Sequence, residues 1–232
     1  MTDYTLYYWS APFRGQFVRA VLAYAGQTWS EAGDDAIGAL MAGAPRDMPV
    51  PFMGPPVLVD PAADVALSQM PAILLYLGQT HGLLSDNPAR QALAIKVVND
   101  ANDVIDELTL DGGRQMWTDK RWTDFVPRLQ KWITLWEELG RRHGLTADAG
   151  FLLGGETADI ADIVTATLWS TLTERFAPIG VMLDGTAPRT AALVKRMAAH
   201  PALAKLARDA RRDYGDVYSG GQIEQSLRKV LG

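Results

Sequence analysis

The chain has 232 residues, enough for one large domain or two small ones, and its hydrophobic share of 48% is ordinary for a globular protein. Its net charge of -5, with Lys and Arg scattered along the chain, argues against binding to nucleic acid, which needs a basic face. The chain contains no cysteine, which excludes disulfides, Cys-ligated zinc and thiol nucleophiles of its own.

A strand, a helix and a second short strand are predicted near the N-terminus. Residues 4–9 are β-branched and aromatic, which is typical of a strand, and residues 27–31 favour another. Between them, apolar residues recur at helical spacing over residues 14–25, and Gly26 follows at a position where helices commonly end. Residues 32–54 are rich in Gly, Ala, Pro and Asp, and their pattern allows no assignment.

A β-hairpin and a helix are predicted next. Residues 57–60 and 65–67 are short apolar runs joined by a turn, and Pro71 then occupies the first position of a helix that ends at Gly78. The resulting order, strand–helix–strand–(helix)–strand–strand–helix, is that of a thioredoxin-like α/β domain with a mixed four-stranded sheet. We assign this N-terminal domain to residues 1–80.

The rest of the chain is helical in pattern. A polar linker at residues 81–90 precedes residues 91–232, for which we predict an all-α helical bundle domain. The predicted helices cover residues 91–109, 124–142, 160–175, 189–199 and 201–213. The tail from residue 214 onward is open to two interpretations, a cap over a pocket or a mobile end.

The sequence carries no signal for a membrane, for export or for a metal. No run approaches the roughly 18 consecutive apolar residues of a membrane span. The first residues lack the basic and apolar regions of a secretory signal, so we expect a cytoplasmic protein. His81, His143 and His200 lie far apart in the sequence without metal-ligand spacing, so no metal site is expected.

Five local patterns occur in a characteristic order along the chain. They are Tyr8-Trp9 with Arg19 eleven residues after Tyr8, Pro56-Val57-Leu58, Gln69-Met70 before a helix, Asn99-Asp100, and the helix-capping pair Asp159 and Asp162. With these patterns the chain resembles the cytosolic glutathione transferases over nearly its full length. It is most similar to the Tyr-type classes (mu, pi and sigma), as a divergent member of bacterial appearance.

The resemblance implies that Tyr8 donates a hydrogen bond to the sulfur of glutathione, the co-substrate, and activates its thiol. Ser10 is the alternative, because Ser10-Ala11-Pro12 resembles the Ser-x-Pro of theta and delta enzymes, whose serine has this role. If Ser10 is aligned with the serine of theta and delta enzymes, however, the helix-ending Gly26 lies two residues too far along the chain. If Tyr8 is aligned with the tyrosine of the Tyr-type classes, no gap is needed. We therefore prefer Tyr8.

The resemblance also implies which residues hold glutathione. Arg14 falls near an arginine that helps to hold the tripeptide, and Asp100 would reach across a homodimer toward the glutathione amino group. A cis-proline, Pro56, would let the backbone of Pro55 meet the cysteinyl part of glutathione. Gln69 and Met70 lie where the family binds the γ-glutamyl carboxylate at a helix N-terminus.

Two of these positions depart from the family pattern. Pro55 has no N–H, so one of the two backbone hydrogen bonds to glutathione is missing. Met70 stands where the family usually has serine, which removes a hydroxyl group. Both departures predict that glutathione is bound more weakly or in a different way.

The implied function is conjugation of glutathione to small hydrophobic electrophiles, as in detoxification. Candidate walls of the electrophile pocket, expected between the domains, are Trp9, Phe13, Met116 and Trp117, although residues of these types are more often part of a core. Two alternatives stay open: a non-catalytic module that binds a ligand or a protein, and another glutathione-dependent reaction (peroxidase, isomerase, dehalogenase or ether lyase).

Overall fold

A mixed four-stranded sheet forms the N-terminal part of the computed structural model, which describes residues 2–232. The strands are β1 (Tyr4–Tyr7), β2 (Trp29–Glu31), β3 (Val57–Asp60) and β4 (Val65–Ser68). Their order is β2-β1-β3-β4; β1 pairs with β2 in parallel and with β3 antiparallel, and β3 and β4 form the predicted hairpin. Met1, the first residue of the predicted N-terminal domain, lies outside the described residues.

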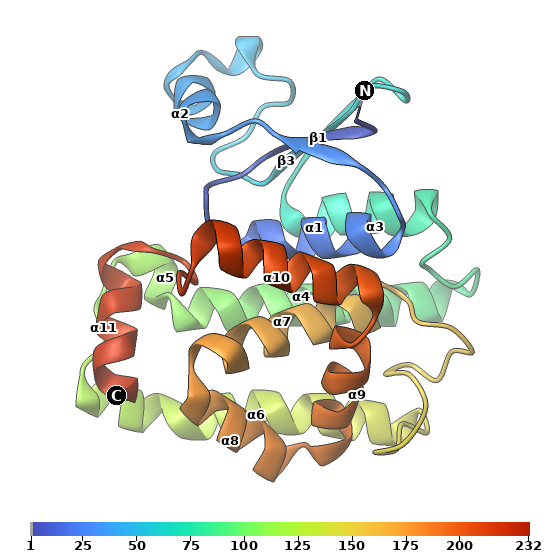
Figure 1. The fold of residues 1–232 in the computed structure, drawn as a ribbon, viewed down its shortest axis with the longest axis vertical. Helices are drawn as coiled ribbons and strands as arrows, with labels where there is room; N and C mark the ends of the chain where they lie inside the picture. Colours follow the sequence, from blue (N-terminus) through green and yellow to red (C-terminus); the bar gives the residue numbers. More distant parts are fainter. Residues whose placement is uncertain (1) are drawn as a thin grey trace.

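Two helices, α1 (Phe13–Tyr24) and α3 (Met70–Thr80), lie side by side between the sheet and the rest of the protein, as Figure 1 shows. A shorter helix, α2 (Asp34–Ala42), lies beside the sheet and away from the helical domain, and a short 3-10 helix follows at Pro45–Asp47. This is the predicted thioredoxin-like arrangement, and it places the N-terminus of α1 at the junction between the two parts of the chain.

The C-terminal part is all helical, as predicted, and is built around one enclosed helix. Its helices are α4 (Pro88–Leu108), α5 (Leu110–Gly113), α6 (Asp119–Arg142), α7 (Ile160–Arg175), α8 (Ala177–Thr186), α9 (Pro188–Ala198), α10 (Pro201–Tyr214) and α11 (Gly221–Leu231). Helix α7 is apolar on nearly all sides and packs against α1, α4, α8 and α9, so it joins the two parts of the fold.

The predicted capping pair fixes the start of α7. The side chain of Asp159 accepts hydrogen bonds from the first turn, and the carboxylate of Asp162 accepts one from the Asp159 backbone N–H and one from Leu152 N–H. Burial, reinforced by the negative charge of Asp159, raises the pKa of Asp162 to about 7. The motif therefore has a structural role.

Several predicted boundaries are wrong by a few residues, for local reasons. Strand β1 ends at Tyr7, not at residue 9, because its pairing with β3 stops there and the chain then turns. Helix α4 begins at Pro88, inside the predicted linker, because the side chain of Asn87 caps it. Helix α6 begins at Asp119, where the exposed polar first turn hides the apolar periodicity and Thr118 provides the cap.

Helices α5, α8 and α11 were not predicted, and the helix expected between the second and third strands, α2, could not be placed from the sequence. Helix α2 has Ile37 as the buried residue that anchors it, so it shows almost no apolar pattern. Helix α8 contains proline and two glycines, and α11 begins at the Gly220-Gly221 pair, all of which weaken a helical pattern. The tail therefore ends in a helix that packs beside α5.

Candidate functional site

Tyr8 follows directly after β1, and its side chain is turned into the protein. It is 4% exposed, and its ring lies against the backbone of α1 at Gly15. A Cβ at Gly15 would lie 2.2 Å from Cδ1 of Tyr8, so only glycine allows the ring to lie this close. The position of Tyr8 is therefore set by both the strand and the first turn of α1.

The hydroxyl group of Tyr8 is held as an acceptor. The backbone N–H of Arg14 donates a hydrogen bond of 2.9 Å to its oxygen. Burial raises the pKa of Tyr8 to about 12, although the nearby positive charge of Arg14 opposes the shift, so the phenol is neutral at pH 7. Among the described residues no acceptor takes the hydroxyl hydrogen, which is therefore available to an incoming group.

Arg14 connects the site to the helical domain. Its Nε donates to the side-chain oxygen of Asn102 at 3.0 Å, and its Nη2 meets a carboxylate oxygen of Asp106 at 3.1 Å. Both partners lie on α4, and the guanidinium lies 4.8 Å from the ring centre of Phe13. Arg14 thus lies at the junction where the resemblance expected a ligand-holding arginine.

Arg19, which the sequence pattern singled out only by its spacing from Tyr8, is a buried arginine next to the Tyr8 ring. It makes a two-bond ion pair with Glu31 at 2.7 and 3.0 Å and donates to the carbonyl of Ala11 at 2.9 Å. Burial alone would lower the pKa of Arg19, but the hydrogen bonds and charge of Glu31 outweigh it and raise the pKa. Its guanidinium lies 5.6 Å from the ring centre of Tyr8.

Ser10, the alternative activator, is exposed and already engaged. Its backbone N–H and its hydroxyl both donate to Oδ1 of Asp34, the first residue of α2, at 2.8 and 3.1 Å. The hydroxyl hydrogen would have to leave a carboxylate before it could meet a thiolate. This arrangement favours Tyr8 over Ser10.

The peptide bond between Pro55 and Pro56 is cis, as the sequence predicted, and β3 begins at the next residue. Gln69 has a φ angle of 72°, which is rare for a residue with a side chain, and it precedes the first turn of α3. No side chain among the described residues caps this helix start. Because Pro71 has no N–H, the first turn has the backbone N–H groups of Met70 and Ala72 as its donors without a side-chain cap.

Met70 is buried in the core, whereas Asp100 lies on helix α4 in an ion pair. The side chain of Met70 is 1% exposed and belongs to the core, so only its backbone is free to serve a ligand. Asp100 forms an ion pair with Lys96 on the same helix. It lies about 200° around α4 from Asn102, so it points away from Arg14 and the site of its own chain.

The four candidate wall residues have different surroundings. Trp9 is 38% exposed, and Phe13 and Met116 are half-buried. Trp117 is buried: its ring packs against Trp122 and Phe125 with centroids 5.4 and 5.1 Å apart. Its indole N–H donates to the carbonyl of Leu108 at 2.9 Å. Trp117 is therefore part of the hydrophobic core, which was the alternative to its being a wall of the electrophile pocket.

Tyr218 belongs to the tail that the sequence left open as a cap or a mobile end, and its contact with the site was not predicted. Its carbonyl accepts a hydrogen bond from the backbone N–H of Phe13, and its ring packs edge-on against Phe13 and Phe176. Its hydroxyl is buried without a hydrogen-bond partner among the described residues. Only the apolar spacing of the last helix gave a sequence signal that this segment folds back onto the protein.

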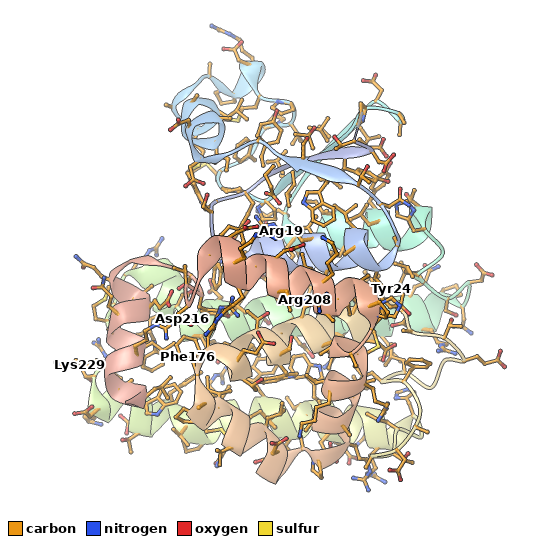
Figure 2. The ribbon with its side chains drawn as sticks, in the orientation of Figure 1. Arg19, Tyr24, Phe176, Arg208, Asp216 and Lys229 are labelled. Atoms are coloured by element: carbon orange, nitrogen blue, oxygen red, sulfur yellow. The ribbon has the colours of Figure 1, made fainter. Side chains whose placement is uncertain are left out.

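The tail is held in place by Glu224. One carboxylate oxygen of Glu224 accepts hydrogen bonds from three successive backbone N–H groups at residues 218–220, at 2.7 to 2.9 Å. Its other oxygen pairs with Arg228 at 2.6 Å. Of the two interpretations of the tail, the structure favours the cap. Phe176, which packs against the tail, and Asp216 within it are labelled in Figure 2.

Residues 2–232 contain neither a metal-binding cluster nor a membrane-spanning helix. In that part of the chain no group of three or more His, Asp or Glu side chains is arranged to hold a metal ion. No helix there has the length and apolar character needed to cross a membrane.

Comparison with known proteins identifies the family. A thioredoxin-like sheet domain joined to a helical bundle is the two-domain architecture to which the family model also points. The model described as "Glutathione S-transferase, C-terminal domain" matches residues 93–230. The chain belongs to the glutathione S-transferase family.

Solved structures agree with this at the level of the fold. NaGST-2 is 24% identical with a TM-score of 0.70, over 90% of this chain and 97% of its own. The monomeric Na-GST-3 of Necator americanus is 21% identical with a TM-score of 0.71, over 89% and 97%. A Nu-class GST from Haemonchus contortus is 22% identical with a TM-score of 0.68, over 90% and 97%. A search of curated proteins found no match.

Proposed function

We propose that this chain is a glutathione S-transferase that conjugates glutathione to small hydrophobic electrophiles, with Tyr8 as the residue that activates the thiol. One observation carries the proposal. The hydroxyl of Tyr8 accepts a hydrogen bond from Arg14 N–H, stays neutral because its pKa is raised to about 12, and keeps its hydrogen for an incoming anion. Tyr8 then acts as a donor that stabilises charge and not as a base.

The energy required is within reach of one such bond and its surroundings. A free thiol with a pKa of about 8.5 is only about 3% thiolate at pH 7. Lowering that pKa by about 2 units requires about 2.7 kcal/mol of differential stabilisation. A hydrogen bond to a charged group contributes about 1.5–3 kcal/mol. The nearby guanidinium groups of Arg14 and Arg19 favour an anion at the same place.

Glutathione is proposed to lie across the junction of β3, α3 and α1. The backbone N–H groups of Met70 and Ala72 in the uncapped first turn of α3 are proposed to bind the γ-glutamyl carboxylate, with Gln69 beside it. The backbone carbonyl of Pro55 is proposed to accept from the cysteinyl N–H, although its missing N–H removes the second bond of the usual pair. One lost hydrogen bond costs on the order of 1 kcal/mol, so we expect weaker binding than a non-proline residue would give.

The electrophile is proposed to bind on the apolar surface formed by Trp9, Phe13 and Met116, with the tail around Tyr218 as its cap. The unpaired hydroxyl of Tyr218 suits an electrophile that carries a hydrogen-bonding oxygen. We no longer assign Trp117 to this surface, because its ring and N–H are used within the helical domain.

A homodimer is proposed on the strength of the family resemblance and the place of Asp100. Since Asp100 points away from the site of its own chain, it can contact glutathione only in a second copy. Na-GST-3, which shares the fold, is described as monomeric, so the fold does not by itself impose a dimer. Sedimentation measurements on wild type and on Asp100→Asn separate assembly from binding.

A non-catalytic binding module is the second candidate function, and two specific observations favour it. Pro55 lacks the N–H that the family uses, and the side chain of Met70 is buried in the core instead of offering a hydroxyl. Under this alternative the chain keeps the fold and a ligand surface but activates no thiol. Glutathione binding then fails, or binding occurs without any change of the thiol pKa.

The test compares wild type, Tyr8→Phe and the matched control Tyr7→Phe in a standard conjugation assay, with calorimetry of glutathione binding. The transferase proposal expects Tyr8→Phe to lose about 10- to 150-fold in turnover, the equivalent of one hydrogen bond to a charged group, while glutathione affinity hardly changes. Tyr7→Phe should behave as wild type. Equal turnover in all three proteins would remove Tyr8 from the mechanism.

A further inference from the structure

An open cavity of about 470 Å³ lies between α1, the edge strand β2 and α10. We call it the α1–α10 cavity. Its volume is within the range of about 300–1,000 Å³ that is usual for small-molecule sites, and like many such sites it lies between two parts of a fold. Figure 1 shows α10 running alongside α1, and Figure 2 labels Arg19 beside α10.

The wall of the cavity contains a buried amide without a partner. Gln16, on α1, is 6% exposed and lines the cavity. Its amide oxygen is buried, and within residues 2–232 it accepts no hydrogen bond. An unsatisfied buried polar atom costs about 1–3 kcal/mol, so a ligand that supplied the missing partner would recover that energy.

Two aromatic side chains form part of the same lining. Trp29 is held by a hydrogen bond of 2.8 Å from its indole N–H to Glu31. Tyr214 is held by the guanidinium of Arg19, which lies 5.3 Å from its ring centre. Fixed aromatic rings offer faces and edges for a flat molecule to pack against.

The charges that line the cavity are already balanced. Three cationic side chains (Arg19, Lys205 and Arg212) and three anionic ones (Glu31, Asp209 and Asp213) face it. Arg19 pairs with Glu31, Lys205 with Asp209, and Arg212 with both Asp209 and Asp213. A charged ligand would enter without a free counter-charge, which disfavours it, whereas an uncharged ligand pays no such desolvation cost.

We propose that the α1–α10 cavity binds an uncharged, planar aromatic lactam or carboxamide. Such a group presents an N–H and a C=O side by side, so it can pair with the primary amide of Gln16 in two hydrogen bonds. Its ring packs against Trp29 and Tyr214. The site is separate from the hydroxyl of Tyr8, because Tyr8 does not line the cavity and the guanidinium of the lining residue Arg19 lies close to the rings of both Tyr8 and Tyr214.

The test uses the bicyclic lactam quinolin-2(1H)-one as the probe and calorimetry as the measurement. We expect Gln16→Leu to weaken binding by at least about tenfold, because two hydrogen bonds are lost. Gln130→Leu, which changes an exposed glutamine on α6, is the matched control and should bind as wild type. Saturating S-methylglutathione should leave the affinity of the probe unchanged, since the two sites are distinct.

A second variant keeps the test independent of how Gln16→Leu folds. Ala202→Phe places a ring into the cavity from α10 and should abolish binding of the probe, with thermal unfolding near that of wild type. The proposal is overturned if the probe does not bind at millimolar concentration, if Gln16→Leu binds as tightly as wild type, or if S-methylglutathione displaces the probe. Equal affinity for the anion quinoline-2-carboxylate would overturn the assignment of an uncharged ligand.

Discussion

The contact between Gly15 and Tyr8 allows the proposed role of Tyr8 to be tested without removing its hydroxyl. In Gly15→Ala, the new Cβ would lie 2.2, 2.5 and 2.9 Å from Cδ1, Cγ and Cε1 of Tyr8. Non-bonded carbon atoms prefer about 3.5–4.0 Å, so the ring must move by more than about 1 Å. The backbone of Gly15 itself accepts alanine, because its φ angle is not in the left-handed region.

The movement should affect activity more than stability. Overpacking of a buried site costs about 1–3 kcal/mol, which corresponds to a fall in Tm of about 2–12 °C for a chain of this size. Misplacing a reacting group by about 1 Å can cost about 100-fold in rate. We therefore expect Gly15→Ala to lose about 100-fold in turnover in a conjugation assay run well below its Tm.

Gly38→Ala is the matched control, because no atom lies within 4 Å of the added Cβ and Gly38 also lies within a helix. It should keep full activity and gain slightly in stability, since alanine favours a helix over glycine by about 1 kcal/mol. If Gly15→Ala turns over as wild type while Tyr8→Phe does not, the reasoning about the position of the ring is refuted.

Three further predictions follow from the described contacts. The phenolate of Tyr8 can be followed in a spectrophotometric titration, as the difference between the wild-type and Tyr8→Phe curves. This difference should show no phenolate below about pH 10, because burial raises the pKa of Tyr8 to about 12. A transition near pH 8 would contradict this. In denaturant unfolding, Trp117→Ala should lower the free energy of unfolding by about 3–5 kcal/mol, because Trp117 is buried. Trp9→Ala should change it little, because Trp9 is more exposed. Equal effects of the two substitutions would argue against the core position of Trp117. Because the pKa of Asp162 is raised, the folded state binds an extra proton between about pH 4 and pH 7, and the contribution of Asp162 to stability falls as the pH rises through that window. Asp162→Asn should therefore flatten the dependence of Tm on pH. An unchanged pH profile of Tm in this variant would disprove the prediction.

The fold could be predicted largely because its elements repeat apolar residues at clear periods. Strand β1 alternates buried Tyr4 and Leu6 with less buried neighbours, and α1 buries Phe17, Val18 and Val21 on one side. The element order predicted a helix where α2 lies, but its position could not be assigned, because Ile37 supplies its anchoring contact and short helices with glycine give no periodic signal. Tertiary packing, which the sequence does not display directly, decides such elements.

The site could be predicted only in part, because chain spacing shows which residues are candidates and not which atoms are already occupied. The sequence favoured Tyr8 over Ser10 on register alone; the hydrogen bonds that engage Ser10 with Asp34 depend on where α2 begins, which the sequence did not reveal. Trp117 and Met116 are neighbours with different surroundings, and nothing in their identities separates them. Tyr218 reaches the site only through the folding back of the tail, held by Glu224.

The pKa of the glutathione thiol in the complex tests the central proposal most directly. It can be measured from the ultraviolet absorbance of the thiolate as a function of pH, with wild type, Tyr8→Phe and Tyr7→Phe compared at saturating glutathione. We predict that wild type and Tyr7→Phe lower the thiol pKa by about 2 units from its free value of about 8.5, and that Tyr8→Phe restores it to near that value. The same thiol pKa in all three proteins, or no bound glutathione at millimolar concentration, would contradict the proposal that Tyr8 activates a thiol in this chain.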